Sequence, residues 1–150
     1  SIEESPVAVY TDDGTYLIEL VAYNEFGCPD TTLYEYELLF KSLYIPNAFM
    51  PQGNKELRNW FPRGVNIKRY SVAVYNIWGV LVWESNKLTN AGAPREAWNG
   101  YKNNDKNDEI MPAGNYIWKA SAVFTDGSVW NGMADEDGVL RTSGIITLIR

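Results

Sequence analysis

The stretch Asn115-Tyr116-Ile117-Trp118-Lys119-Ala120-Ser121-Ala122-Val123-Phe124-Thr125 decides the fold class of this 150-residue chain. Successive side chains of an extended strand point to opposite faces. One face of this stretch is apolar and the other is largely polar, which is typical of a sheet with one face in the core and one in solvent. The apolar face comprises Tyr116, Trp118, Ala120, Ala122 and Phe124, and the polar face Asn115, Lys119, Ser121 and Thr125.

Strand signals of this kind recur along the chain. Segments rich in β-branched and aromatic residues are separated by turn signals such as Asp12-Asp13-Gly14 and Pro112-Ala113-Gly114. No segment of helical length shows a convincing 3.6-residue period. We therefore predict an all-β fold, an immunoglobulin-like antiparallel β-sandwich. The other predicted strands are 15–24, 31–40, 67–76, 80–84 and 142–150.

The last seven residues, Gly144-Ile145-Ile146-Thr147-Leu148-Ile149-Arg150, predict a strand that is apolar on both faces. Ile145 and Ile149 point one way, and Ile146 and Leu148 point the other way. Such a pattern predicts burial on both faces, either within the domain or against a partner.

Composition excludes several classes of partner. Thirteen Lys and Arg against nineteen Asp and Glu give a net charge of −6, which opposes binding to nucleic acid or to anionic membranes. The longest apolar runs are only a few residues, whereas a spanning helix needs about 20. We therefore expect no nucleic-acid partner and no direct membrane span.

The residue types also argue against catalysis. The chain has no His, so a Ser–His–acid or Cys–His arrangement is impossible. The dense acidic segments, Asn103–Glu109 and Asp135–Gly138, are polar loops without the spacing of an EF-hand. Oxygens of Asp105, Asn107 and Glu109 could hold a cation, but a solvated loop is favoured. We predict no enzyme and no cofactor, with calcium as the alternative left open.

Cys28 is the single cysteine, which excludes a Cys-based metal site and a disulfide within this sequence. A small, half-buried thiol is favoured over a reactive one, because there is no His to activate it and the nearby Asp30 disfavours a thiolate.

Five motifs follow one another in order along residues 43–150. They are Ile45-Pro46-Asn47-Ala48-Phe49-x-Pro51, Tyr75-Asn76-x-Trp78-Gly79-x-x-Val82-x-Glu84-Ser85, Trp98-Asn99-Gly100, Pro112-Ala113-Gly114-x-Tyr116-x-Trp118 and Gly144-Ile145-Ile146-Thr147-Leu148-Ile149-Arg150. Together they resemble the gliding-motility-associated C-terminal domain family, the type B sorting domain of proteins exported by the type IX secretion system of Bacteroidota.

The resemblance implies a C-terminal secretion and sorting signal that directs a large cell-surface protein, such as a gliding adhesin, through the type IX secretion system. The implied partners are the translocon and an outer-membrane β-barrel of the PorP/SprF or shuttle type. The implied location is the cell surface, in association with the outer membrane. Candidate partner-recognition residues are Gly144 to Arg150, captured by strand addition at an edge or by an apolar groove, with Arg150 supplying a charged contact. Alternatively, this strand only completes the sandwich.

Two departures from the family pattern matter. The family's acidic stretch after the first motif is replaced by Gln52–Asn59, so we expect no calcium site there. Asn76-Ile77-Trp78 replaces the usual Asn-Arg-Trp and removes a cation. We expect the tryptophans of the motif region to serve core and hairpin packing rather than a ligand platform; these are Trp78, Trp83, Trp98 and Trp118.

Residues 1–42 resemble the C-terminal strands of a PKD-like repeat, through Gly14–Leu20 and Asn24–Thr31. Tyr16 is then expected at the corner where a strand begins. Two or three strands cannot close a sandwich, so we predict an incomplete second β-sandwich from a longer protein. By the same resemblance, Cys28 is predicted to form a disulfide with an earlier cysteine of the full-length repeat.

A second functional class is a surface module that binds carbohydrate or another ligand. Trp60, Trp83 and Trp130 would supply its stacking strip.

Overall fold

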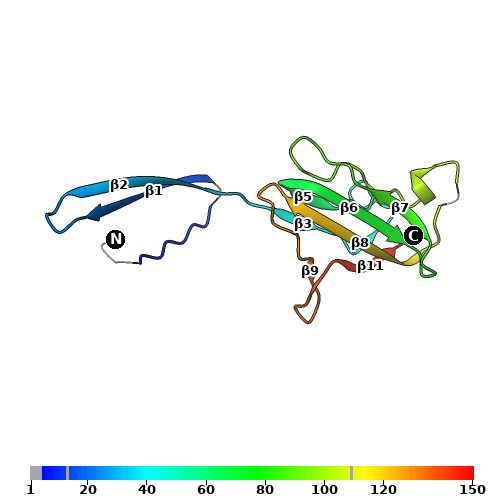
Figure 1. Cartoon of the computed structure of the whole chain (residues 1–150). Coiled ribbons are helices and arrows are strands. Elements are labelled where there is room, and N and C mark those ends of the chain that lie inside the picture. The colour runs from blue at the N-terminus through cyan, green and yellow to red at the C-terminus, as the bar shows by residue number, and fades with distance from the viewer. Residues whose placement is uncertain (1–4, 13, 109) are drawn as a thin grey trace. The chain divides into compact units, whose positions relative to one another are not determined.

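The computed structural model describes residues 5–12, 14–108 and 110–150, which fall into two compact units, Ser1–Phe40 and Lys41–Arg150. Figure 1 shows both, with strands labelled in chain order.

The first unit is a two-stranded antiparallel ladder of β1 (Gly14–Tyr23) and β2 (Pro29–Leu38). Ten residue pairs run from Gly14↔Leu38 to Tyr23↔Pro29. Asn24 closes the connecting turn, because its Oδ1 accepts hydrogen bonds from the backbone N–H groups of Phe26 and Cys28, both at 2.9 Å. No described residue of this unit is buried. The two predicted strands are confirmed, with ends shifted by one or two residues.

The second unit is built on a five-stranded sheet with the order β4-β11-β8-β6-β7. All neighbours are antiparallel except β4 and β11, which are parallel. Two small antiparallel sheets pair β3 with β5 and β9 with β10. The all-β prediction is confirmed, and the multiple antiparallel sheets are consistent with a β-sandwich. The elements are β3 (Ser42–Tyr44), β4 (Ala48–Phe49), β5 (Arg63–Val65), β6 (Ile67–Tyr75), β7 (Leu81–Ser85), the 3₁₀ turn η1 (Lys102–Asn104), β8 (Gly114–Phe124), β9 (Met133–Ala134), β10 (Leu140–Arg141) and β11 (Ser143–Leu148).

The core joins one face of the large sheet to side chains from the loops. The alternation predicted for β8 is confirmed, since all five apolar-face residues are buried whereas Ile117 on the other face is 39% exposed. Trp60 and Trp98 come from loops and are fully buried. Their backbones form an isolated bridge, with each N–H donating to the other carbonyl at 2.9 Å. Burial also confirms the packing roles predicted for Trp83, Trp98 and Trp118.

Trp78 corrects the packing prediction, because its side chain is 79% exposed. The hairpin between β6 and β7 is tight. Asn76 Oδ1 accepts from the backbone N–H of Trp78 at 3.1 Å and of Val80 at 2.9 Å, and Gly79 has a φ of 78°. The turn carries Trp78 beyond the last paired residues of the two strands, so the indole does not reach the core.

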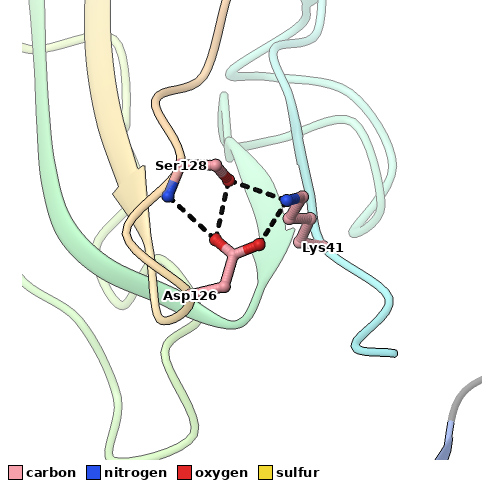
Figure 2. Close-up of polar contacts among 3 residues, drawn as sticks. All are labelled: Lys41, Asp126 and Ser128. Carbon is pink, nitrogen blue, oxygen red and sulfur yellow. Dashed lines mark hydrogen bonds and ion pairs between the residues drawn. The ribbon is translucent and has the colours of Figure 1, made fainter. Parts of the chain in front are cut away.

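A polar cluster fixes the start of this unit against the loop that follows β8 (Figure 2). Lys41 Nζ donates to the Asp126 carboxylate and to Ser128 Oγ, the latter at 2.7 Å. Ser128 donates to Asp126 Oδ1 through its hydroxyl at 2.7 Å and its backbone N–H at 3.0 Å. The hydrogen bond from Lys41, supported by those from Ser128, holds the pKa of Asp126 well below its usual range.

Candidate recognition surface at the last strand

The strand β11 lies between β8 and β4, and β4 pairs with its second half, so that half is not a sheet edge. It pairs with β8 from Ser143↔Lys119 to Leu148↔Gly114, and with β4 through Thr147↔Ala48 and Leu148↔Phe49. The Ile45–Pro51 motif supplies β4, a parallel partner that the order of strands along the chain did not indicate.

The two faces of β11 have different environments. Ile146 and Leu148 are 0% and 1% exposed and complete the core. Ile145 and Ile149 are 59% and 42% exposed. Burying Ile146 and Leu148 contributes about 1.5 to 3 kcal/mol each to folding. Only one of the two apolar faces is therefore buried within the described part of the chain.

Packing explains why position 144, the first of the candidate partner-recognition residues, is a glycine. It pairs with Trp118 across the β8–β11 ladder. A Cβ atom at position 144 would lie 2.9 Å from three atoms of the Trp118 indole, closer than real Cβ contacts come. The Trp118 indole thus leaves no room for a side chain at position 144.

The exposed face of β11 continues an apolar row across the sheet. Ile145 pairs with Ile117, Ile117 with Tyr75, and Tyr75 with Leu81, so the row crosses β11, β8, β6 and β7. Two sequence motifs about 70 residues apart, those containing Tyr75 and Ile145, therefore meet on one face.

The end of the segment is accessible. Arg150 is exposed, and its guanidinium makes a long contact, 3.5 Å, to the carbonyl oxygen of Met111. Thr147 Oγ1 donates to Asn115 Oδ1 at 3.1 Å. The cation predicted for partner contact is thus available at the surface.

A groove of about 550 Å³ runs along the first half of β11. Its lining includes Trp118 and Gly144, together with Ile45, Asn47 and residues of the β9–β10 hairpin. Sequence reasoning did not find this groove, because the hairpin is formed by two-residue strands and the β4–β11 pairing is long-range.

The other candidate sites have structural roles. Asp135 closes the β9–β10 turn by accepting hydrogen bonds from Arg141 and from the N–H of Val139, and the Arg141 bond is the main cause of its lowered pKa. Asp105 Oδ1 accepts from the backbone and side chain of Asn107 at 2.9 Å, while Glu109 lies outside the described residues. Within the described ranges, no three His, Cys, Asp or Glu residues are placed to hold a metal.

The proposed stacking strip is wrong. Trp60, Trp83 and Trp130 are 0%, 3% and 7% exposed, and a sugar ring can stack only on an accessible aromatic face. Cys28 is a free, exposed thiol, so the half-buried interpretation is also wrong. Its disulfide in a longer protein stays a prediction.

The comparison with family models places this fold in a known group. The model of the CHU_C type IX secretion signal domain matches residues 43–140, and no curated protein matched the chain. The match ends before Gly144–Arg150. No helix among the described residues is both long and apolar enough to cross a membrane. The family description names a type IX secretion signal, which implies interaction with that system and export to the cell surface, and it names no enzymatic activity. The chain belongs to the CHU_C type IX secretion signal domain family.

Proposed function

We propose that residues 43–150 are the C-terminal sorting domain of a large surface protein, such as a gliding adhesin of a Bacteroidota species. The domain directs its cargo through the type IX translocon to an outer-membrane β-barrel of the PorP/SprF or shuttle type, which retains the cargo at the surface. The family match over residues 43–140 supports the sorting role.

Gly144–Arg150 contribute the partner contact while remaining in the sheet. The observation that carries this proposal is the division of one strand into a buried and an exposed apolar face. Ile146 and Leu148 hold β11 in the core, so extracting the strand would expose both side chains. Ile145, Ile149 and Arg150 are accessible without any rearrangement. The partner therefore binds the folded domain.

The first unit, within residues 1–42, supplies strands of a PKD-like repeat. Tyr16 Oη donates to the Asp12 carbonyl at 2.6 Å, the contact expected of a tyrosine at a strand corner. Leu17, Leu20 and Leu33 are 68%, 60% and 59% exposed, an apolar surface that further strands of such a repeat would cover.

The test is surface delivery of a fluorescent protein fused to the 150-residue chain in a gliding Bacteroidota host. The test variant is Ile145→Ser with Ile149→Ser, because deleting the whole segment would also remove core residues. The matched control is Leu57→Ser with Val129→Ser, two side chains that are 51% and 62% exposed elsewhere on the same unit. We expect the test variant to lose at least about tenfold in surface fluorescence with an unchanged melting temperature. Delivery equal to that of the control would refute the role of this segment.

A further inference from the structure

The first half of β11 has an open edge. Thr142 O accepts from Ala120 N at 2.9 Å, so the even-numbered residues of this ladder carry the hydrogen bonds to β8. The odd-numbered residues face the other side, where Thr147 N donates to Asn47 O and Ile149 N to Phe49 O. Ser143 and Ile145 share that orientation, but β4 pairs only with Thr147 and Leu148. Their backbone groups have no strand partner on this side among the described residues.

The start of β4 does not continue the parallel ladder along Ser143–Ile145. In the register Thr147↔Ala48, Pro46 lies opposite Ile145 and its own backbone groups face away from β11, where its carbonyl oxygen accepts from Trp60 Nε1 at 2.7 Å. The N–H of Ile45, which a continued ladder would direct to Ser143, donates instead to Met133 Sδ at 3.1 Å, a weak acceptor. The edge at Ser143–Ile145 is left open because Ile45 turns to this other partner.

The residues of the open edge, Ser143 to Ile145, line the groove beside β11. The β9–β10 hairpin contributes Asp135, Glu136, Asp137 and Arg141 to the same lining. Arg141 pairs with Asp135. Glu136 and Asp137 are exposed and form no ion pair with another described residue. The groove therefore combines unpaired strand backbone with a negative rim.

We propose that this groove binds an extended segment of the sorting partner, which adds as a short strand to Ser143–Ile145 and places Lys or Arg side chains beside Glu136 and Asp137. Main-chain pairing requires an extended ligand, and the carboxylates of the rim select a basic one. This proposal rests on the proposed function for the identity of the partner, although its chemistry can be tested on the isolated chain.

The experiment measures amide hydrogen exchange of the full ¹⁵N-labelled chain with three synthetic peptides. The first is an eight-residue peptide of alternating lysine and valine, the second replaces lysine with glutamate, and the third is the lysine peptide N-methylated at every residue, which has no N–H to donate to the edge. We expect the first peptide alone to slow exchange of the Ile145 amide, by at least about tenfold at saturation, while the Ile146 amide, already paired with β8, changes little. No protection by the lysine peptide, or equal protection by all three, overturns the proposal.

A charge variant tests the contribution of the rim carboxylates, Glu136 and Asp137, separately from that of the open backbone edge. Glu136→Lys with Asp137→Lys is expected to weaken binding of the lysine peptide at least about fivefold. The matched control, Glu84→Lys with Asp108→Lys, changes two exposed carboxylates outside the groove and is expected to leave binding unchanged. Equal effects of the two variants would contradict rim recognition.

The remaining outcomes are also decisive. Protection of the Ile145 amide without peptide, rising with protein concentration, would assign the groove to a second copy of the chain and overturn the proposal. If the peptides fail but Ile145→Ser with Ile149→Ser still abolishes surface delivery, only the groove proposal falls. If the peptides bind as expected but delivery is unaffected by that variant, only the sorting role of the exposed face falls.

Discussion

The two units each contain a strand that begins with the same local motif, but they bury that strand to different extents. β1 and β8 each start at a glycine followed two residues later by a tyrosine. Tyr16 Oη donates to the Asp12 carbonyl at 2.6 Å, and Tyr116 Oη donates to the Pro112 carbonyl at 2.7 Å. Tyr116 is 4% exposed and packs edge-on against Trp98, with ring centroids 5.1 Å apart.

Tyr16 is half-buried and stacks on Tyr10 within a unit that has no buried residue in its described part. The same local motif therefore fixes where a strand starts but does not create a core. The core requires five strands and the loops that bring Trp60 and Trp98 onto them. Four sets of variants test the packing of the second unit, and two of these sets compare it directly with the first.

Trp98→Ala is expected to have the largest effect. It removes a fully buried indole and its 2.8 Å hydrogen bond from Nε1 to the Tyr101 carbonyl. The free energy of unfolding should fall by about 3 to 5 kcal/mol. Tyr36→Ala in β2, at a side chain that is 38% exposed, should change it by less than about 1 kcal/mol. Urea denaturation followed by tryptophan fluorescence and circular dichroism measures both. Equal losses would erase the distinction between the units.

Gly144→Ala should lower the free energy of unfolding by about 1 to 3 kcal/mol, because the new Cβ would overlap the Trp118 indole. Ser143→Ala, the neighbouring exposed position, should change stability by less than about 0.5 kcal/mol. Thermal melts of the two variants provide the comparison. A Gly144→Ala domain as stable as the parent would show that β11 is less tightly packed than described.

Tyr116→Phe and Tyr16→Phe compare the shared motif directly. Each removes one hydroxyl-to-carbonyl hydrogen bond. The buried hydrogen bond from Tyr116 to Pro112 should contribute about 1 kcal/mol to the free energy of unfolding. The half-exposed hydrogen bond from Tyr16 to Asp12 should contribute less than about 0.5 kcal/mol. Chemical denaturation of the paired variants measures the difference. A larger loss from Tyr16→Phe would mean that the first unit is more ordered by this contact than its burial indicates.

Tyr70→Phe should have the smallest effect on the free energy of unfolding at neutral pH. Unlike the preceding substitutions, it should not lower that free energy. The Tyr70 hydroxyl is buried without a hydrogen-bond partner in the described part of the chain, so removing it should be neutral or stabilising by up to about 1 kcal/mol. Burial, with a smaller contribution from Glu96, raises the pKa of Tyr70.

The raised pKa fixes the direction of the pH effect. The folded state holds the Tyr70 proton more tightly than the unfolded state, so the associated stability is complete below the unfolded pKa of about 10 and is lost as the pH rises above it. Denaturant midpoints between pH 8 and pH 11 should fall more steeply for the parent than for Tyr70→Phe. Parallel curves would contradict a neutral, buried Tyr70.

Local alternation was enough to predict the long strands and the buried face of β8, because a period of two is read directly from the residues. It was not enough for Trp78, where the turn rather than the residue type decides exposure, or for Trp60 and Trp130, which lie outside the named strands and are nevertheless buried. The open edge of β11 depends on Ile45, whose N–H donates to Met133 Sδ, 88 positions away along the chain. Such contacts follow from tertiary packing and leave no periodic signal.

The two faces of β11 give the most direct test of the sorting account. Surface delivery of the fused fluorescent protein and its melting temperature should be measured for Ile145→Ser with Ile149→Ser and for Ile146→Ser with Leu148→Ser. We expect the exposed-face variant, Ile145→Ser with Ile149→Ser, to melt like the parent and not to be delivered, whereas the core-face variant should lose both its fold and its delivery. An exposed-face variant that folds and reaches the surface as efficiently as the parent would contradict recognition through this strand.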